Sequence, residues 1–476
     1  YTEFETPVST GDPNTTFDGE NSSGTWTLRI QDRATGVSGQ LRKWRLDIKG
    51  DSEAPDLTVS EVQGPTSAIA GETINVSATV SNIGVKNAED SFGLRFLLST
   101  DSTIDLATLV LRDSAALQEE DAAYAAKGGW SRHKSPQPLY STGDVESLLP
   151  LMQPVPFGES REVASTTTGA SAHVTLVPAG HILGSACPQV TVGGARVVVS
   201  GDLGRASHPL LAPPAPRPGA DVVLVESTYG DRRHRDDPET LLADTLTRTL
   251  GRGGVVVIPA FAVDRTEVVL MTLRRLMTQG RVPRVPVFAD SPMALGALAV
   301  YRRAVAAHSA DVRTPLGGVD GAFDPGDLRE VHDARDSMAI NDPGYPCIIV
   351  SASGMASGGR VVHHLKHLLP DPRNTVVLVG FQAMGTRGRA LRDGAEQLKM
   401  HGRYVPVRAE VVNVEGFSVH ADSDDLVAWL ASGPDEPQVV YVVHGEPDAA
   451  AALADRVRGE LGWMAVTPQH DEIVRV

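Results

Sequence analysis

Strand–loop–helix units recur along the second part of the chain, and they limit the fold more than any other sequence feature. Apolar runs followed by amphipathic helical patterns occur at 255–277, 285–305, 347–369 and 375–395. Continuous apolar strands that alternate with helices are typical of a parallel sheet covered on both faces. The pattern therefore predicts an α/β domain whose ligands bind beyond the carboxyl ends of its strands.

Length and composition narrow the class of protein. A chain of 476 residues is too long for one ordinary core, so two to four domains are expected. The net charge of -16 argues against a generally basic nucleic-acid binder and leaves room for a local basic groove. Cys187 and Cys347 are the two cysteines, which excludes a disulfide framework and a cysteine zinc cluster. No apolar run reaches about 18 residues, so no membrane span is expected.

The first hundred residues have a different pattern. Residues 24–50 alternate apolar and polar residues on both sides of a glycine turn, which predicts a hairpin in a half-buried sheet. Residues 54–105 show short alternating strands with Gly and Asn turns. Helical spacing begins at residue 106 and ends at Gly128, where a C-cap would fall. The chain starts at Tyr1 in mid-pattern, so it reads as a fragment.

Polar residues follow several of the expected strands. His181 and Asp202 each come after an apolar run and stand beside a glycine, and Glu226 and His420 repeat the arrangement. Imidazole and carboxylate groups without thiolate are ligands of a hard or borderline metal ion. For any one histidine a partly buried, satisfied ring is the simpler interpretation, but four strand-end groups in one α/β protein favour a metal site. His401 and His444 are further candidates.

Two loops rich in Ser, Gly and Arg also follow strands. SASGMASGGR contains Ser353, Ser357 and Arg360, and FQAMGTRGR contains Arg387. Small residues let backbone N–H groups approach an anion at a helix N-terminus, which suggests a phosphate site. Tight glycine packing between strand and helix explains such loops about as often. The HHLKH run at 363–367 is better explained by a solvated or phosphate-facing helix than by a pair of metal ligands.

Seven ordered motifs carry a resemblance to a known family. They are AGHILGSA, SGDLG, ESTYGD, IPAFAVDRTE, SASGMASGGR, VGFQAMGTRGRAL and GFSVHAD. In this order they resemble the β-CASP branch of the metallo-β-lactamase superfamily, which contains RNA-processing nucleases, over roughly residues 106–476. Residues 1–50 resemble part of the P domain of proprotein convertases, and residues 54–104 resemble the immunoglobulin-like CARDB module.

The resemblance implies an architecture. It is an α/β metallo-β-lactamase-like sandwich, incomplete at its N-terminus, with an inserted α/β β-CASP domain and all-β segments in front. The first part of the core would cover 106–240, the insert 241–365, and the second part of the core with the RNA-specificity region 366–476. Asp264 stands in IPAFAVDRTE where the family leads us to expect a small residue.

The resemblance also implies roles for single residues. His181 would be a zinc ligand, Asp202 the carboxylate that bridges two zinc ions, and His420 a ligand of the second zinc. Glu226 would be the acidic residue of the first β-CASP motif, and His401 would lie near the scissile phosphate. A hydroxide between the metal ions would attack phosphorus in single-stranded RNA, and the metals would stabilise the developing charge.

One family motif is absent from the sequence. The principal zinc motif has the form His-x-His-x-Asp-His and belongs upstream of the helix at 106–128, but the first of the fourteen histidines is His133. The β pattern gives way to the nuclease pattern without a linker near 99–115. We therefore expect an artificial or misassembled fusion, or else a gene that lost its metal site, and weak zinc binding in either case.

Three functions from different classes stay open. The first is a zinc-dependent RNA hydrolase, the second an inactive protein that binds RNA or phosphate, and the third a secreted protein defined by its N-terminal segments. A serine hydrolase is disfavoured, because GMASG at 354–358 is not the Gly-x-Ser-x-Gly elbow. Residues 106–476 suggest a cytoplasmic protein and the N-terminal segments an extracellular one, and a homodimer is a candidate assembly.

Overall fold

The chain forms two compact units in a computed structural model. The structure describes residues 24–31, 57–63, 73–82, 96–98, 101–128, 133, 135–165, 171–234, 238–313, 321–469 and 472–474. One unit comprises residues 1–94 and 162–173, and the other comprises 95–161 and 174–476.

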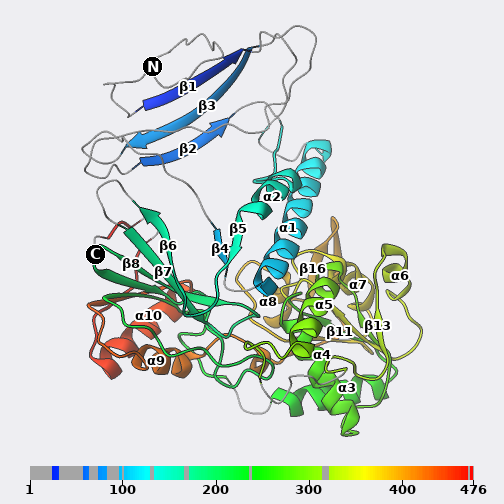
Figure 1. The fold of residues 1–476 in the computed structure, drawn as a ribbon. Helices are drawn as coiled ribbons and strands as arrows, with labels where there is room; N and C mark the ends of the chain where they lie inside the picture. The colour runs from blue at the N-terminus through cyan, green and yellow to red at the C-terminus, as the bar shows by residue number, and fades with distance from the viewer. Residues whose placement is uncertain are drawn as a thin grey trace. The chain divides into compact units, whose positions relative to one another are not determined.

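The first unit contains an antiparallel sheet of three described strands in the order β1-β3-β2 (Figure 1). The strands are β1 (Gly24–Gln31), β2 (Leu57–Gln63) and β3 (Thr73–Asn82). β1 pairs with β3 along its whole length, from Gly24↔Val80 to Gln31↔Thr73. A strand of the P-domain-like segment therefore pairs with a strand of the CARDB-like segment. The second strand of the expected hairpin, near 41–48, lies outside the described residues.

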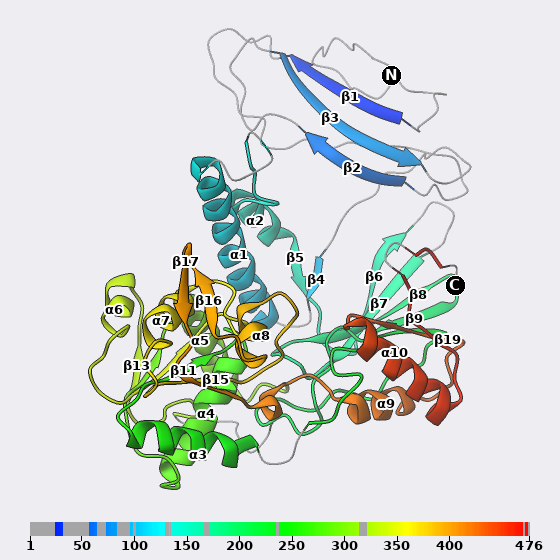
Figure 2. The ribbon, with the colours of Figure 1, turned by 180° about the vertical axis from the view of Figure 1, so that it is seen from behind.

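A second sheet has seven strands in the order β20-β19-β10-β9-β8-β7-β6 (Figure 2). Its strands are β6 (Ser160–Ser165), β7 (Ser171–Pro178), β8 (Ala186–Val192), β9 (Ala195–Val199), β10 (Val222–Glu226), β19 (Val439–Val443) and β20 (Ala465–Val466). The strands β9, β10, β19 and β20 run parallel, whereas β8 and β9 form an antiparallel pair. Helices α9 (Ser423–Ala431) and α10 (Pro447–Arg456) pack on this sheet through an apolar cluster that includes Trp429 and Leu453.

The large unit contains a six-stranded parallel sheet in the order β13-β12-β14-β11-β15-β18. Its strands are β11 (Val256–Pro259), β12 (Val287–Ala289), β13 (Leu328–Glu330), β14 (Ile348–Ser351), β15 (Thr375–Leu378) and β18 (Glu410–Asn413). Its helices are α3 (Pro238–Gly251), α4 (Arg265–Thr278), α5 (Pro292–Ala306), α6 (Ala334–Ala339), α7 (Arg360–Leu368) and α8 (Arg387–Arg392).

Successive residues of β11 explain why both faces of this sheet are covered. Val256 and Ile258 point into the cluster that α3, α4 and α5 share, and Val257 points into the opposite cluster with α7 and α8. Alternate side chains of a strand lie on opposite faces, so an all-apolar strand needs helices on both. The α/β architecture predicted from the strand–helix units is confirmed.

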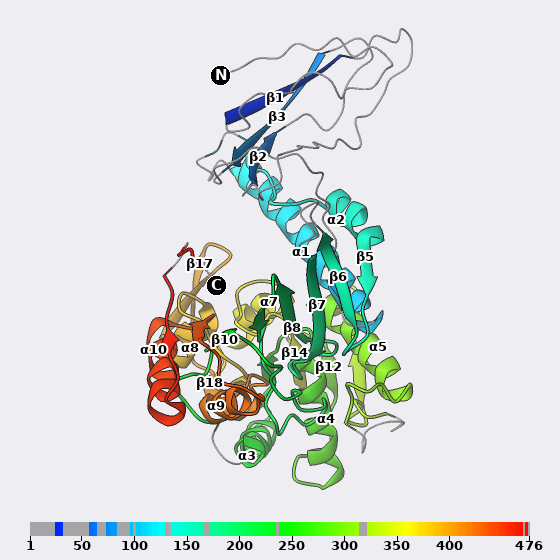
Figure 3. The ribbon, with the colours of Figure 1, turned by 60° about the vertical axis from the view of Figure 1, so that its left-hand side comes forward.

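Further helices and strands lie outside these sheets. They are β4 (Phe96–Leu98), α1 (Asp101–Gly128), α2 (Thr142–Leu148), β5 (Met152–Pro154), β16 (Gln397–Met400) and β17 (Arg403–Pro406). Helix α1 begins at Asp101, earlier than the expected residue 106, and lies beside α5 (Figure 3). There Arg303 of α5 pairs with Asp105 at 2.6 Å. Cys187 and Cys347 are free and buried. No helix in the described part of the chain has the length and apolarity needed to cross a membrane.

Candidate metal and phosphate centre

Three parallel strands deliver acidic and imidazole groups to one edge of the seven-stranded sheet. β10 pairs with β9 on one side and β19 on the other, and Glu226 lies opposite Val443 at the end of β19. Asp202, Glu226 and His444 therefore stand at or just beyond the carboxyl ends of three neighbouring strands. This is the edge at which α/β sheets bind ligands.

Backbone pairing around Gly204 adds the other two histidines. The amide of Gly204 donates to the carbonyl of Ala179, two residues before His181, at 2.9 Å. Gly204 also forms an isolated antiparallel bridge with His420. One short segment after Asp202 thus holds the turns that carry His181 and His420.

Glycine is required where these segments meet. Gly180 has a φ of 66°, in the left-handed region that favours glycine. A side chain at Gly204 would place its Cβ 1.8 Å from the carbonyl oxygen of Gly180. The two glycines beside the candidate ligands therefore let the backbones approach closely enough to share a site.

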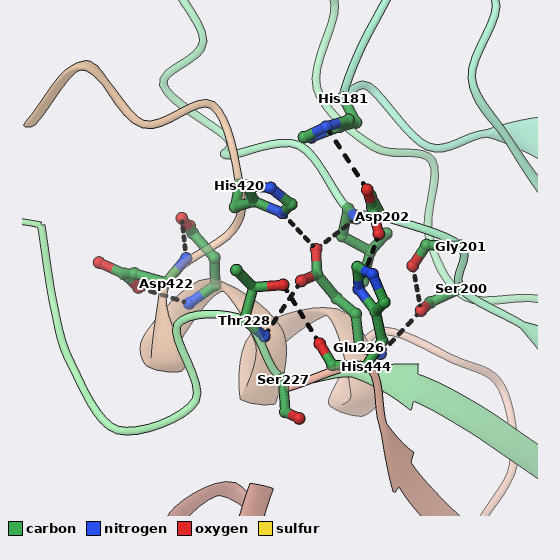
Figure 4. A network of polar contacts seen from close by, with 12 residues as sticks. His181, Ser200, Gly201, Asp202, Glu226, Ser227, Thr228, His420, Asp422 and His444 are labelled. Carbon is green, nitrogen blue, oxygen red and sulfur yellow. Dashed lines mark hydrogen bonds and ion pairs between the residues drawn. The ribbon is translucent and has the colours of Figure 1, made fainter. Parts of the chain in front are cut away.

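The five polar groups form two overlapping sets around Asp202 (Figure 4). His181, Asp202 and His420 offer ligand atoms that all lie within 4.8 Å of one another, and so do Asp202, Glu226 and His444. The Nε2 atom of His181 lies 3.8 Å from Oδ2 of Asp202, too far for a hydrogen bond. The rings of His181 and His420 are 4.3 Å apart between centroids.

A hydrogen bond to Glu226 orients His420, and an ion-pair contact joins His444 to Asp202. Nδ1 of His420 lies 3.2 Å from Oε1 of Glu226, and Nδ1 of His444 lies 3.1 Å from Oδ1 of Asp202. A carboxylate oxygen accepts, so Nδ1 of His420 donates to Glu226. Carboxylates that orient a histidine in this way are common around metal ions.

The side chains of the cluster differ sharply in burial, and burial shifts the pKa values of several of them. Glu226 is 1% exposed and accepts from the amide of Leu203 at 2.7 Å, whereas the side chain of His444 is 63% exposed. Although burial opposes ionisation, the hydrogen bond from His420 leads the effects that hold the pKa of Glu226 below its usual value. Burial also raises the pKa of Asp202 and, with His420 nearby, lowers the pKa of His181 to about 3. His181 is therefore a neutral imidazole at physiological pH.

These groups open into a cavity of about 830 Å³. His181, Asp202, His420 and His444 line it together with Arg265 and two phenylalanines, Phe261 and Phe381. The cavity walls come from the strand ends of both large sheets, because Phe261 and Phe381 follow β11 and β15.

The donor set fits a divalent transition metal ion. The buried Nδ1 of His181 has no hydrogen-bond partner among the described residues, and its pKa keeps the ring neutral. Ligand histidines must be neutral, and Asp202 can bridge because it belongs to both sets. Each set nevertheless offers three donors of which one is shared, and Glu226 already binds Leu203 and His420.

His401 does not lie with these groups. It occupies the turn between β16 and β17, with a φ of 46°, and its ring lies 4.4 Å from that of His363 on α7. It is not among the residues that line the cavity. The resemblance implies a place near the scissile phosphate for His401, but the β16–β17 hairpin packs on the α7 side of the six-stranded sheet, so His401 does not line this cavity.

The predicted phosphate-binding arginines are used within the protein. Arg360 donates to Asp290 at 2.7 Å and to the carbonyl of Val331. Arg387 donates to the carbonyls of Lys399 and Ser357. Neither arginine lines the cavity, and neither do the two serines of the same prediction, Ser353 and Ser357. These contacts fit the alternative explanation, in which the glycine-rich loop is packed rather than bound to phosphate.

Two residues of the cavity were undervalued by sequence reasoning. His444 follows the apolar strand β19 and precedes a glycine, the same signal that selected His181. Arg265 follows Asp264, and an adjacent acidic residue suggests an internal ion pair. Asp264 instead receives hydrogen bonds from His208 and Tyr301.

Comparison with known proteins agrees with this geometry. Residues 266–391 match the Beta-Casp domain, and residues 404–468 match a domain described as "Zn-dependent metallo-hydrolase RNA specificity domain". Residues 7–48 match the proprotein convertase P-domain, and residues 54–122 match CARDB. The Beta-Casp match thus begins and ends further along the chain than the expected insert at 241–365, and the CARDB match runs into α1.

Whole relatives extend the comparison. A ribonuclease of Thermus thermophilus is 37% identical over 75% of this chain and 76% of its own length. An RNase J-like protein of Methanocaldococcus jannaschii is 32% identical over 64% of this chain and 70% of its own. Transcription termination factor FttA of Thermococcus kodakarensis is 29% identical over 80% of this chain, which spans 58% of that protein. The chain belongs to the β-CASP family of metallo-β-lactamase-fold RNA nucleases.

Proposed function

We propose that this chain binds single-stranded RNA in the cavity around Asp202 and holds metal too weakly for efficient hydrolysis. The observation that carries the proposal is the convergence of His181, Asp202, His420 and His444 on one cavity in a member of an RNA nuclease family. In the 476 residues no His-x-His-x-Asp-His motif adds the further donors that a dinuclear site requires.

The residues of the cavity have separable tasks. His181 and His420 would hold one zinc ion with Asp202, and His444 would hold a second with the same carboxylate. Zinc, when bound, supplies a Lewis acid and an activated water for attack on a phosphodiester. Glu226 orients His420 through Nδ1 and keeps its Nε2 directed to the site. Phe261 and Phe381 give flat apolar surfaces on which unpaired bases can stack.

The relatives' names support a role in RNA processing, and we place that role of residues 106–476 in the cytoplasm. The P-domain-like and CARDB-like segments would then lie in the cytoplasm together with the nuclease-like unit. Fractionation of the native host with an antibody against the large unit tests this placement, and recovery of the whole chain outside the cell would contradict it.

Zinc content and RNA binding, measured on the same preparation, test the proposal. After dialysis against trace zinc, the wild type should hold well under the two ions of an intact centre. It should nevertheless bind a labelled single-stranded RNA in an anisotropy titration, and duplex RNA more weakly. Asp202→Ala serves as the control for metal held at this cavity. Two tightly held zinc ions that Asp202→Ala removes would overturn metal deficiency, and absence of RNA binding would overturn the RNA assignment.

A further inference from the structure

Arg265 is a buried arginine with two unpaired side-chain nitrogens among the described residues. Its side chain is 4% exposed, and its Nε and Nη1 atoms have no hydrogen-bond acceptor there. No ion pair reaches it in the described part of the chain. A guanidinium group carries five donors and stays charged, so leaving it unpaired in the interior costs several kcal/mol.

Burial lowers the pKa of Arg265, and the nearby charge of Asp264 acts against this, but neither of the two carboxylates nearest in sequence forms an ion pair with it. Asp264 receives hydrogen bonds from Nε2 of His208 and from the hydroxyl of Tyr301, both at 3.1 Å. Glu267 has no hydrogen-bond partner on either side-chain oxygen among the described residues, and burial raises its pKa well above the usual range. Glu267 forms no ion pair with Arg265 in the described part of the chain.

Arg265 is one of the residues that line the cavity of the candidate metal ligands. Arg265 lines this cavity with His181 and Asp202, and it lies against the backbone at Gly380, where an added Cβ would be 3.7 Å from Nε. It is the one arginine or lysine among the eighteen cavity-lining residues, all of which the structure describes. Two carboxylates, Asp202 and Glu446, line the same space and would repel an anion.

We propose that Arg265 binds a phosphate group in this cavity, namely a backbone phosphate of the RNA. The proposal rests on the proposed RNA-binding function for its ligand and on the buried side chain with two unpaired nitrogens for its site. Arginine binds phosphate through two parallel N–H donors, which gives this residue the chemistry of a phosphate ligand. The phosphate would thereby be held beside His181 and Asp202 without the help of a metal ion.

Substitution of Arg265 by methionine tests the proposal in the full chain. Methionine keeps most of the length and removes the charge, and Arg302→Met is the matched control, because Arg302 is partly exposed and pairs with Glu330 at 2.7 Å. Arg265→Met should weaken binding of a labelled oligouridylate roughly tenfold to a hundredfold, the range for a lost charged hydrogen-bonded pair. The slope of log affinity against log salt should fall by about 0.7, the value for one phosphate contact in a single strand.

Thermal unfolding with inorganic phosphate separates binding from a structural role. Phosphate should raise the melting temperature of the wild type and of Arg302→Met, and leave Arg265→Met unchanged. Without phosphate, Arg265→Met should be at least as stable as the wild type, because an unpaired buried charge has been removed. Arg265→Lys keeps the charge without the fork, so its phosphate response should be intermediate, and this variant decides the matter if methionine prevents folding.

The outcomes distinguish this proposal from the RNA assignment. Equal RNA affinity and equal phosphate response in Arg265→Met and the wild type would overturn the role of Arg265 and leave RNA binding intact. A phosphate response that depends on Arg265, in a protein that binds no RNA, would support the anion site and overturn the RNA assignment. A strong loss of stability in Arg265→Met and Arg265→Lys, with the phosphate response retained, would make Arg265 a structural residue and overturn the proposal.

Discussion

Asp202 is the residue on which both halves of the site depend. It is shared by the set with His181 and His420 and by the set with Glu226 and His444. Strand β9 ends at Val199, and the turn through Gly201, with a φ of 56°, carries Asp202 over the sheet edge. A carboxylate in this position can accept hydrogen bonds from neighbouring imidazoles, or it can bridge two metal ions. The same two oxygens cannot fill both roles at once.

At the residue scale, substitutions of His444 and of His401 are predicted to affect metal binding differently. His444→Ala should weaken cobalt(II) or zinc binding at the cavity by roughly tenfold or more, as for other residues around metal ions. His401→Ala should leave it unchanged, because His401 lies beside His363 and does not line the cavity. Cobalt absorption titrations of the two variants measure the difference. Equal loss in both would show that the cavity is not the metal site.

A second residue-scale prediction concerns Gly204. Gly204→Ala would force its Cβ into the Gly180 carbonyl, so the free energy of unfolding should fall by about 1–3 kcal/mol or more. Gly251→Ala is the control, because Gly251 ends helix α3 and nothing lies within 4 Å of the position that an alanine Cβ would take there. Alanine at that position should be neutral or should stabilise by about 0.5–1 kcal/mol. Urea unfolding of both variants checks the pair, and a Gly204→Ala protein as stable as the wild type would refute the close approach.

Single residues also show what the sequence reveals and what it hides. His181, Asp202 and Glu226 stand out because each follows an apolar strand, and strand ends meet at a sheet edge. His420 follows no strand directly and reaches the site through its bridge with Gly204. Whether Arg265 and Arg360 have partners within the protein cannot be deduced in this way. Whether a guanidinium group is free depends on partners 70 residues away, such as Asp290 for Arg360.

At the element scale, a buried polar cluster joins β12 to the helices beyond it. Asp290 follows β12 and binds Ser337 of α6 at 2.6 Å, Arg360 of α7 at 2.7 Å and His364 of α7 at 2.6 Å. The carboxylate is fully buried, and all three partners converge on it. The cluster fixes α6 and α7 against the carboxyl edge of the sheet.

Asp290→Ala should therefore destabilise the large unit by about 3–5 kcal/mol, because it removes the buried acceptor that Ser337, Arg360 and His364 share. Asp327→Ala is the control, since Asp327 pairs with Arg329 at the surface, 46% and 47% exposed, and should cost under about 1 kcal/mol. Denaturant unfolding of the two variants measures both values. Similar small losses would mean that the buried cluster is not required for stability.

The same cluster predicts a dependence on pH. Although burial opposes ionisation, hydrogen bonds from His364, Ser337 and Arg360 hold the pKa of Asp290 below its ordinary value of 3.8. A depressed folded-state pKa gives stability that is complete above pH 3.8 and is lost as the pH falls through the folded value. Asp290→Asn should flatten this acid limb of the stability curve, measured by urea unfolding at a series of pH values. An acid limb identical to that of the wild type would assign it to other carboxylates.

The secondary-structure elements could be predicted more fully than the neighbours with which the strands pair. The alternation of apolar strands and amphipathic helices predicts β11–α4, β12–α5, β14–α7 and β15–α8, because an all-apolar strand must be covered on both faces. The pairing of β1 with β3 was not foreseen, because local alternation predicts a strand without naming its neighbour. The start of α1 at Asp101 was missed because Ser-Thr-Asp-Ser-Thr resembles a loop.

At the scale of the whole molecule, the chain contains two compact units with different sheet types. We predict that they unfold in separate transitions in scanning calorimetry, and that limited proteolysis releases a large fragment that starts before Asp101. A cut at residue 106, where the sequence pattern changes, would fall inside α1, where Leu106 is buried. One cooperative transition and a chain resistant to cleavage ahead of α1 would contradict this division.

Cleavage of a labelled single-stranded RNA tests the central claim most directly. The wild type and Asp202→Ala are incubated with the RNA at saturating protein, with zinc or manganese, and the products are resolved on a denaturing gel. The donors around Asp202 predict RNA that is bound but cut slowly or not at all, with no difference between the two proteins. Robust cleavage by the wild type that Asp202→Ala abolishes would contradict metal deficiency and show a working nuclease.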